Sequence, residues 1–514
     1  FWEDIMIIKN KIVRDTIILT VMQLFLDSAA LLLNIFITRQ LGTSAMGILS
    51  LTGSFLILIG MVSNGNAFLC ISRLVSEEIG KKNGNPNRIL KYGLLMCTFL
   101  SVISGLFLIA FSEPLSIKFF KSAEMSQPIK LMAAALPIGA YSACFKGFFN
   151  ASRTVSTTAM ADILEFAVKA IIIIVLTFAV KVPTNAAVCD IMVSGIIAGN
   201  CTSLVMFLFI FFKNRQVYSS RSSLSLKKYI SLAVPVMAGG CLTSILSSAN
   251  DALIPVTLRQ YGNSVKEAFS QFGVFEAIVI PTLFFPSVVI CSLSGIVVSE
   301  TARAAASKNM KRIKNIAGNL IEKTLIFSIL VAAVLMHYGS EIGTLLDGGE
   351  LAGRMITIIA PVVPFIYLEI ILEAMIKGMG LQGFSSLNYL AEYAVRISVV
   401  LIFVPRIGFY GIVASYYASN IIGNVSRFIK IMIHVKPDIS VFKVFIMPTA
   451  YVVMTMKASE LLLKLMHIHN ESLVSIVVDV LLWSAMYIFM VLGWKNQGLS
   501  EKLFSDRKVN HEIC

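Results

Sequence analysis

Long apolar runs dominate the chain, and short polar stretches rich in Lys, Arg, Asn and Gly separate them. A run of about 20 apolar residues is long enough to cross the ~30 Å hydrocarbon core of a bilayer as a helix. A window of that length predicts about fourteen membrane-spanning helices. Their approximate limits are 16–38, 46–71, 91–111, 128–149, 157–180, 186–212, 229–257, 268–298, 319–337, 352–376, 386–404, 409–434, 442–464 and 472–494.

The runs predict helices, because they are too long for membrane strands and lack the period-two alternation of a barrel. Composition agrees: the 514 residues are 57% hydrophobic and 14% charged, with a mean hydropathy of +0.82. A soluble globular protein carries about 25% charged residues. We therefore predict an all-α polytopic membrane protein. The cysteines form no C-x-x-C and no metal spacing, so we interpret them as small apolar packing residues.

The basic residues predict the orientation. When the predicted spans alternate in direction, most Lys and Arg fall in loops on the side of the N-terminus, and the densest of these loops are 73–91, 213–228 and 302–314. The positive-inside rule then predicts that both termini are cytoplasmic. The net charge of +14 predicts contact with anionic membrane lipids rather than with nucleic acid.

An internal repeat divides the chain. TRQLGTS (38–44), at the end of the first span, recurs as LRQYGNS (258–264) at the end of the seventh. EFAVKA (165–170) in the fifth span recurs as EYAVRI (392–397) in the eleventh. Such a duplication of six spans predicts two lobes of the same topology, related by a pseudo-twofold axis along the membrane normal.

The repeat sets the predicted domain limits. Two six-helix lobes are followed by two helices that have no counterpart in the repeat. The predicted parts are an N-terminal lobe 1–228 with a basic cytoplasmic linker at 213–228, a C-terminal lobe 229–440, an appended helix pair 441–495 and a cytoplasmic tail 496–514.

The order of motifs resembles the multidrug/oligosaccharidyl-lipid/polysaccharide (MOP) exporter superfamily. Within it, the chain is similar to the branch of stage V sporulation protein B and of the MurJ/MviN-type lipid II flippases. The motifs that carry the resemblance are ITRQLGTSAMGIL (37–49), NAFLCISRLVSE (66–77), FKGFFNASRTVSTTAMADILEFAVKA (145–170), QFGVFEAIVIPTLFFPSVVICSLSGIVVSE (271–300), AEYAVRI (391–397) and FVPRIGFYG (403–411).

The resemblance implies a transporter with a MATE- or MurJ-like fold in a bacterial-type plasma membrane. It implies movement of a polyprenyl-diphosphate-linked oligosaccharide, such as a peptidoglycan precursor of the wall or spore cortex, from the inner to the outer leaflet by alternating access. No bond is hydrolysed and no cofactor is implied. The first span departs from the lipid II flippases, since it carries Asp27 where the resemblance implies an arginine.

Ionisable residues inside spans are costly, by roughly 2.5–3.5 kcal/mol each, so each one is a candidate for function. Glu165/Lys169 and Glu392/Arg396 are spaced i,i+4, which suits either a self-neutralising pair between neighbouring spans or a positive charge offered to a lipid diphosphate. Lys457 and Glu460 suit a structural pair. Glu369 and Glu373 repel if both are ionised, which predicts that one is protonated or faces water. The predicted substrate-cavity residues are Asp27, Asn34, Asn64, Asn66, Lys169, Glu276 and Arg396.

The unpaired acids also predict a cation site. An isolated carboxylate at low dielectric takes up a proton or binds a cation. Asn388 lies one turn before Glu392 and supplies a neutral oxygen of the kind that Na⁺ needs. We predict that Asp251, Asn388 and Glu392 couple transport to Na⁺ or H⁺.

Glu276 is followed by Pro281 and Pro286, so we predict that the eighth span is broken or bent. Asn64, Gly65 and Asn66 fall at the equivalent stretch of the second span. Together they predict a polar, deformable cavity wall, with simple helix packing as the alternative.

Two other functions stay open. The acidic first span favours a cation-coupled multidrug antiporter of the same superfamily. The basic loops and the tail favour a membrane scaffold that recruits partners for envelope synthesis. An enzyme is not predicted, because the sequence contains no nucleophile–base pair, phosphate loop or zinc motif.

Overall fold

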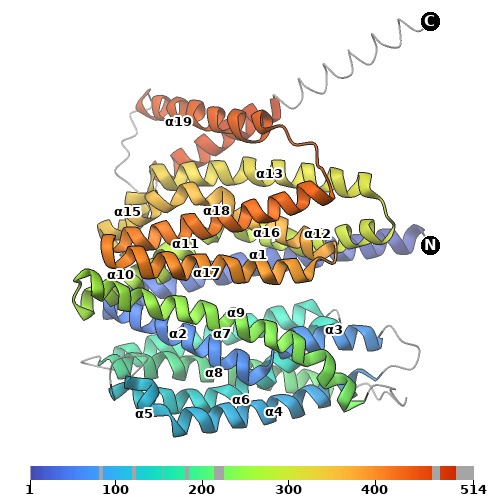
Figure 1. Cartoon of the computed structure of the whole chain (residues 1–514), viewed down its shortest axis with the longest axis vertical. Helices are drawn as coiled ribbons and strands as arrows, with labels where there is room; N and C mark the ends of the chain where they lie inside the picture. Colours follow the sequence, from blue (N-terminus) through green and yellow to red (C-terminus); the bar gives the residue numbers. More distant parts are fainter. Residues whose placement is uncertain are drawn as a thin grey trace, which may run out of the picture. The chain divides into compact units, whose positions relative to one another are not determined.

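The computed structural model describes residues 2–79, 85–117, 123–152, 154–179, 184–213, 225–465 and 475–493. Helices account for almost all of these residues, as Figure 1 shows. The predicted all-α fold class is therefore confirmed. Most of the predicted linker 213–228 and the whole predicted tail 496–514 lie outside the described residues.

Eleven described helices are long and apolar enough to cross a membrane. They coincide with eleven of the predicted spans, but the predicted count of about fourteen is not confirmed. The other three predicted spans are helical but carry more charged or polar residues. One is α7 (Val155–Ala179), in which Asp162, Glu165 and Lys169 leave no long stretch without charge. The others are α18 (Phe409–His434) and α19 (Met447–Leu465).

The chain folds into two compact units. The first unit comprises residues 1–288, 346–351 and 389–418. Its further elements are α1 (Trp2–Leu41), α2 (Thr43–Asn64), α3 (Ala67–Ile79), α4 (Pro86–Ala110), α5 (Ser112–Leu115), η2 (Ala123–Met125), α6 (Ser126–Ala151), α8 (Asn185–Lys213), α9 (Leu226–Tyr261), α10 (Val265–Val274), η3 (Phe275–Val279), α11 (Ile280–Phe284), η4 (Phe285–Ser287) and most of α17 (Gln382–Ile407).

The second unit comprises residues 289–345, 352–388 and 419–514. It contains most of α18, all of α19 and a helix Ser475–Gly493. Its other elements are α12 (Val288–Ala306), α13 (Met310–His337), α14 (Gly339–Leu345), most of α15 (Gly349–Ile359), η5 (Ala360–Val362), α16 (Val363–Gly378), the start of α17 and η6 (Phe442–Ile446).

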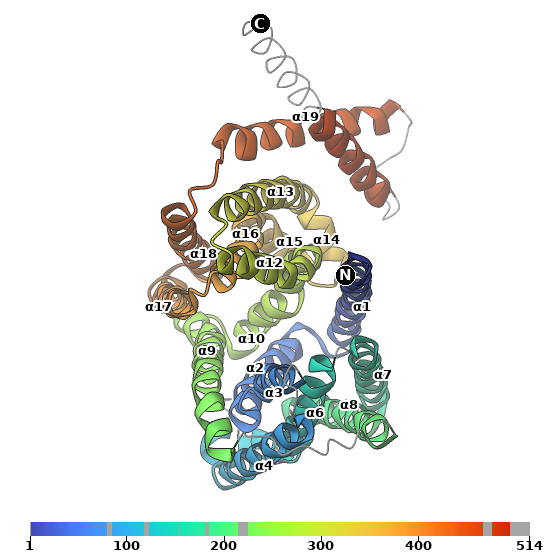
Figure 2. The same cartoon turned by 90° about the vertical axis from the view of Figure 1, so that its right-hand side faces the viewer.

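The N-terminal helices of the first unit pack side by side, with α7 beside α8 and α4 beside α6 in the view of Figure 2. The core between α3, α4 and α6 contains Ile71, Ile89 and Cys144, which are fully buried. Three cysteines, Cys70, Cys97 and Cys144, are buried in this core. Their location fits the predicted role of the cysteines as packing residues.

Two glycines bring α2 and α10 into backbone contact. A Cβ on Gly47 would lie 1.9 Å from the Phe269 carbonyl oxygen, and one on Gly273 would lie 2.3 Å from the Gly47 nitrogen. The same contact holds the hydroxyls of Thr43 and Ser270 at 2.6 Å. A larger residue at either glycine must therefore push the two helices apart.

Both copies of the repeated motif place a glycine with a positive φ angle after a helix. Gly42 and Gly262 both have positive φ angles, of 86° and 118°, between the end of one helix and the start of the next. Only glycine adopts these angles without strain. In the second copy, Ser264 and Glu267 form a capping box at the start of α10.

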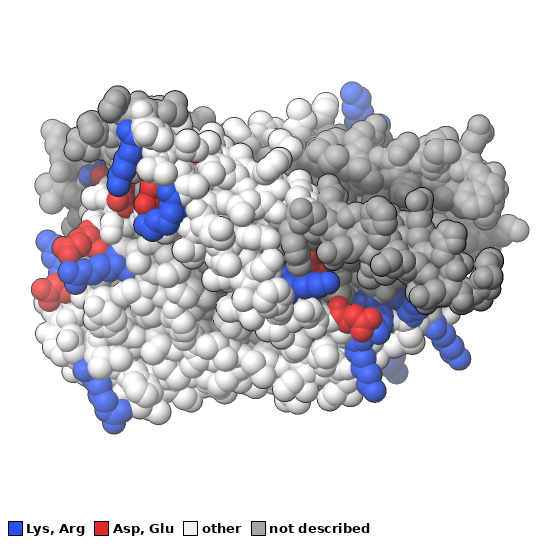
Figure 3. Space-filling model, turned by 90° about the horizontal axis from the view of Figure 1, so that it is seen from above, with Lys and Arg blue, Asp and Glu red and all other residues white. Residues whose placement is uncertain are grey.

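In the second unit, aromatic side chains fasten α19 and helix Ser475–Gly493 to α13. The Trp483 indole donates to the Val452 carbonyl at 3.1 Å, and the Tyr487 hydroxyl donates to the Ile326 carbonyl at 2.9 Å. Tyr338 donates to Asp479. On the face in Figure 3, charged side chains lie toward both ends and the surface between them is uncharged, as expected for membrane-spanning helices.

Candidate functional site

A cavity of about 310 Å³ lies within the first unit, between α1, α2, α7, α8 and η3. This volume is at the lower end of the ~300–1,000 Å³ typical of ligand pockets. Most of its walls are apolar. The polar residues that line it are Asn34, Ser50, Ser54, Lys169, Thr177 and Glu276. Three residues predicted for a substrate cavity, Asn34, Lys169 and Glu276, thus line the same cavity.

The wall that carries Glu276 is an irregular helix. Residues Phe275–Val279 form a π-helical turn, and Phe285–Ser287 form a 3₁₀ turn. Pro281 has no N–H, so the carbonyl of Ala277, four residues earlier, loses its donor within the helix. The side chain of Asn34 replaces that donor at 3.0 Å. The break predicted from the two prolines is present, and α1 stabilises it.

Lys169 is half-buried on α7, where its Nζ lies 5.1 Å from the centre of the Phe166 ring. Its charge interacts with that of Glu165, but the described residues show no ion pair between them. The fourth and fifth spans are joined instead by Lys146 and Asp162, whose Nζ and Oδ1 lie 2.6 Å apart. Lys146 and Asp162 thus join these two spans, and Lys169 lines the cavity.

Asp251 and Arg396 lie beside the cavity wall. The Ser54 hydroxyl, itself a cavity residue, donates to Asp251 Oδ2 at 2.6 Å. The Asn250 amide donates to Asp251 Oδ1 at 3.3 Å. The charge of Arg396 interacts with the charges of both Asp251 and Glu276. The sequence places no opposite charge within a helical turn of Asp251, and α17 supplies one from another part of the chain.

Aromatic rings hold Arg396 in place. Its guanidinium lies 4.3 Å from the centre of the Tyr416 ring and 5.5 Å from that of Tyr393. The Tyr416 ring in turn packs edge-on against Phe275, 5.1 Å away, next to Glu276. Cation–π contacts of this kind stabilise a partly desolvated guanidinium and fix its position.

The remaining predicted residues lie elsewhere. Asp27 is half-buried on α1 and accepts a hydrogen bond from Gln23 at 2.8 Å. Asn64 and Asn66 shape the break between α2 and α3, where the Asn66 N–H donates to Asn64 Oδ1 at 2.8 Å. None of the three is among the residues that line the described cavity.

Of the predicted cation site, Asp251 and Glu392 are buried in the first unit. Asn388 is buried in the second unit, where its amide donates to the Gly423 carbonyl at 3.2 Å. The grouping of these three residues around a cation stays a prediction.

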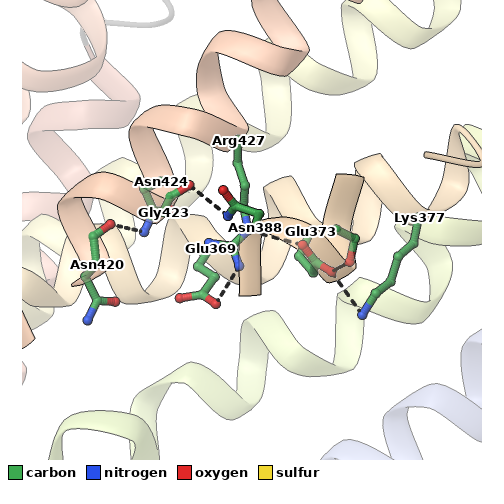
Figure 4. Close-up of polar contacts among 9 residues, drawn as sticks. Glu369, Glu373, Lys377, Asn388, Asn420, Gly423, Asn424 and Arg427 are labelled. Carbon is green, nitrogen blue, oxygen red and sulfur yellow. Dashed lines mark hydrogen bonds and ion pairs between the residues drawn. The ribbon is translucent and has the colours of Figure 1, made fainter. Parts of the chain in front are cut away.

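A second group of buried charges lies in the second unit (Figure 4). Arg427 of α18 is 0% exposed and points between two acids of α16. Its Nη2 lies 3.1 Å from Glu369 Oε1, and its Nε lies 3.1 Å from Glu373 Oε2. Glu373 also contacts Lys377 at 3.2 Å and accepts a hydrogen bond from Ser385. Two acids and two bases thus balance.

Sequence reasoning missed Arg427. The prediction that Glu369 and Glu373 repel, so that one is protonated or faces water, was wrong, because a guanidinium separates them. The signal was available, since two glutamates one turn apart in an apolar helix require a cation nearby. Arg427 lies toward the C-terminal end of its predicted span, where a basic residue also fits the flank of a span.

Comparison with known proteins gives the family. The family described as "Polysaccharide biosynthesis protein" matches residues 12–293. Stage V sporulation protein B of Bacillus subtilis (strain 168) is 20% identical over 409 residues, which cover 77% of this chain and 79% of that protein. Sporulation protein YkvU of the same organism is 18% identical over 409 residues, covering 76% and 88%.

Solved structures share the fold. The lipid II flippase MurJ in an inward closed conformation aligns with a TM-score of 0.69 at 12% identity, covering 94% of this chain and 99% of that one. An inward-facing multidrug resistance MATE family transporter of the MOP superfamily aligns with a TM-score of 0.63 at 14% identity, covering 80% and 94%.

The fold is therefore that of the membrane transporters of the MOP superfamily. Because the family match extends over more than half of the sequence, the chain belongs to the polysaccharide biosynthesis protein family. Both findings confirm the resemblance that the motifs indicated.

Proposed function

We propose that this protein moves a polyprenyl-diphosphate-linked oligosaccharide from the inner to the outer leaflet of a bacterial-type plasma membrane by alternating access. The observation that carries the proposal is Lys169, a cation that lines a mostly apolar cavity and has no ion pair among the described residues. Membership of the polysaccharide biosynthesis family supports a lipid-linked sugar as the cargo. Similarity to stage V sporulation protein B supports a role in the spore envelope.

The cavity suits part of such a head group. The Lys169 ammonium offers charge-assisted hydrogen bonds to a phosphate oxygen. Asn34, Ser50 and Ser54 offer neutral donors and acceptors to sugar hydroxyls on the neighbouring wall. A volume of about 310 Å³ leaves no room for a long oligosaccharide, so the distal sugars and the polyprenyl tail lie outside it. The protein orients and moves the lipid, and no bond of the cargo is broken.

A second function is favoured by a different observation. Asp251 and Glu276 both lie within electrostatic range of the Arg396 guanidinium, so these three residues carry more negative than positive charge when both acids are ionised. An acidic site suits an organic cation, and the MATE-like fold is compatible with an antiporter that exchanges such a cation for H⁺ or Na⁺. A scaffold without transport is the third candidate. A scaffold role does not explain why a lysine lines a cavity in spite of the free-energy cost of placing a charge inside a span.

A leaflet-accessibility assay tests these functions. Proteoliposomes carrying the purified protein are loaded with a lipid-linked muropeptide or with a cationic dye, and the fraction of probe that reaches the opposite leaflet or lumen is measured over time. We expect the muropeptide lipid to move and Lys169→Gln to slow it at least about tenfold, since one charge-assisted hydrogen bond contributes roughly 1.5–3 kcal/mol. Lys457→Gln, which removes a lysine outside the cavity, serves as the matched control. Movement of the dye alone favours the antiporter, and movement of neither favours the scaffold.

The same assay addresses coupling. If Asp251, Asn388 and Glu392 bind Na⁺ or H⁺, collapsing the corresponding gradient slows transport. Unchanged rates after both gradients are collapsed would remove the coupling proposal and leave the flippase proposal intact.

A further inference from the structure

Two carboxylates beside the cavity lie within electrostatic range of one guanidinium. The charge of Arg396 interacts with Asp251 of α9 and with Glu276 of η3, and the two carboxylates also repel each other. When both acids are ionised, this group of three residues carries one excess negative charge. An excess charge in a low-dielectric site is costly and is relieved by a proton or a cation.

The two acids differ in what surrounds them. Asp251 is 8% exposed and accepts hydrogen bonds from Ser54 and Asn250. Glu276 lines the cavity, and no described residue donates a hydrogen bond to its carboxylate. The two hydrogen bonds to Asp251 favour its ionised form, and Glu276 has no such support among the described residues. Glu276 is therefore the acid on which a proton is more readily exchanged, and the cavity gives the proton a path to it.

Several elements bring charged, aromatic or polar groups close to Glu276. Lys169 of α7 lines the same cavity, so a ligand bound there lies between the lysine and the acid. The Tyr416 ring of α18 packs against Phe275 and Arg396. Asn250 Oδ1 is buried and has no hydrogen-bond partner among the described residues. One hydrogen-bond acceptor beside Asp251 is therefore unused among the described residues.

We propose that Glu276 is the group that exchanges a proton when a ligand enters the cavity, and that the sign of the ligand's charge sets the direction of exchange. A phosphate held by Lys169 adds negative charge near Glu276 and draws a proton onto it. An organic cation displaces that proton. Proton uptake by Glu276 on binding of a phosphate rests on the proposed flippase function. Proton exchange at Glu276 as such does not, because it applies to either class of ligand.

Proton counting during binding tests the proposal. The purified full-length chain in weakly buffered detergent solution, at several pH values between about 6 and 9, is titrated with farnesyl diphosphate, a short prenyl diphosphate, while a pH indicator dye records proton uptake. We expect wild type to take up more protons per bound ligand than Glu276→Gln, with a difference of at most about one proton. Glu460→Gln removes a half-buried carboxylate that pairs with Lys457 outside the cavity, and we expect it to match wild type. Protons taken up by the diphosphate itself cancel in the comparison.

The outcomes separate the two proposals. Binding with equal proton uptake in wild type and Glu276→Gln overturns the role of Glu276 and leaves the flippase proposal standing. If farnesyl diphosphate does not bind but rhodamine 6G binds, and wild type releases a proton that Glu276→Gln does not, the role of Glu276 holds and the flippase proposal fails. Absence of binding by both probes contradicts both proposals. Thermal unfolding of Glu276→Gln, with Glu276→Asp as a second variant that keeps the carboxylate, shows whether the protein tested is folded.

Discussion

The two units treat buried charge in opposite ways. In the second unit, Arg427 binds Glu369 and Glu373, and Lys377 completes a balanced set of charges. In the first unit, Asp251 and Glu276 interact with one guanidinium, while Lys169 faces a cavity across the same bundle. Balanced charges join two helices and leave nothing for a ligand to neutralise. Charges beside a cavity that form no ion pair among the described residues, such as Lys169 and Glu276, leave an interaction for a ligand or an ion to complete.

This difference shows when an ionisable residue in an apolar helix is a candidate for function. The cost of insertion alone marks each such residue as a candidate. The cost is offset within the protein when an opposite charge and further hydrogen bonds lie within reach, as at Arg427. A functional role follows only where that compensation is incomplete and water or a ligand has access. Lys169 and Glu276 meet this condition.

The largest loss of stability is expected when Arg427, the central cation of the second unit, is removed. Arg427→Met leaves the buried Glu373 and the half-buried Glu369 one turn apart with no guanidinium between them, so we expect it to lower the free energy of unfolding by about 3–5 kcal/mol. Thermal unfolding in detergent measures the loss. The control is the triple variant R427M/E369Q/E373Q, which carries neither the cation nor the acids. It should recover most of the stability, since a buried ion network is often replaced by neutral residues at little cost. A single variant as stable as wild type would show that the cluster does not brace the unit.

The cavity of the first unit depends on backbone contact rather than on ion pairs. Gly47→Ala places a Cβ against the Phe269 carbonyl, so α2 and α10 must separate, which we expect to cost about 1–3 kcal/mol. Gly60 lies on the same helix, and a Cβ added there would meet no atom within 4 Å. Gly60→Ala should therefore stabilise by roughly 0.5–1 kcal/mol. Comparing the melting temperatures of the two variants tests the contact, and equal values contradict it.

The π-helical wall that presents Glu276 is held by one side chain. Asn34→Leu leaves the Ala277 carbonyl without its donor, so we expect a loss of about 1–2 kcal/mol. Ser28→Ala on the same helix removes a hydroxyl that bonds only to the Leu24 carbonyl of its own helix and should cost less than about 0.5 kcal/mol. Unfolding curves of both variants decide the point. If they coincide, Asn34 does not stabilise the wall.

The smallest change in stability is expected at an exposed ion pair. Lys457 Nζ lies 3.0 Å from Glu460 Oε2, and the lysine side chain is 67% exposed. Lys457→Gln should change stability by less than about 0.5 kcal/mol, and added salt should reduce the change further. A loss of stability above about 1 kcal/mol that persists in high salt would show that this pair stabilises the protein as the charges around Arg427 do.

Much of the fold follows from hydropathy. Eleven predicted spans coincide with long apolar helices, because the length of an apolar run is set directly by the thickness of the bilayer. The prolines at 281 and 286 predicted the break of the eighth span, since a proline cannot donate to the carbonyl four residues before it. The number of spans does not follow from hydropathy as directly. In α7 the three charged residues that are candidates for function also interrupt the apolar run that marks a span.

The candidate site was only partly predictable. Spacing along one helix identified Lys169 and Glu165 as neighbours, but it could not show that the fourth span's Lys146 pairs with Asp162 instead. Pairing across helices depends on how the helices rotate and pack, which periodicity does not fix. For the same reason, spacing could not show that Arg427 lies between Glu369 and Glu373, or that the charge of Arg396 acts on both Asp251 and Glu276.

The measurement that tests this account most directly is the rate of lipid translocation in proteoliposomes for two folded variants. One is Lys169→Gln, which removes the cavity cation. The other is R427M/E369Q/E373Q, which neutralises the balanced cluster. The account predicts that Lys169→Gln slows movement of a lipid-linked muropeptide at least about tenfold with an unchanged melting temperature, while the triple variant keeps the wild-type rate. Equal rates for the two variants, or a slow triple variant beside a normal Lys169→Gln, would contradict the claim that the unbalanced charges serve transport and the balanced ones serve structure.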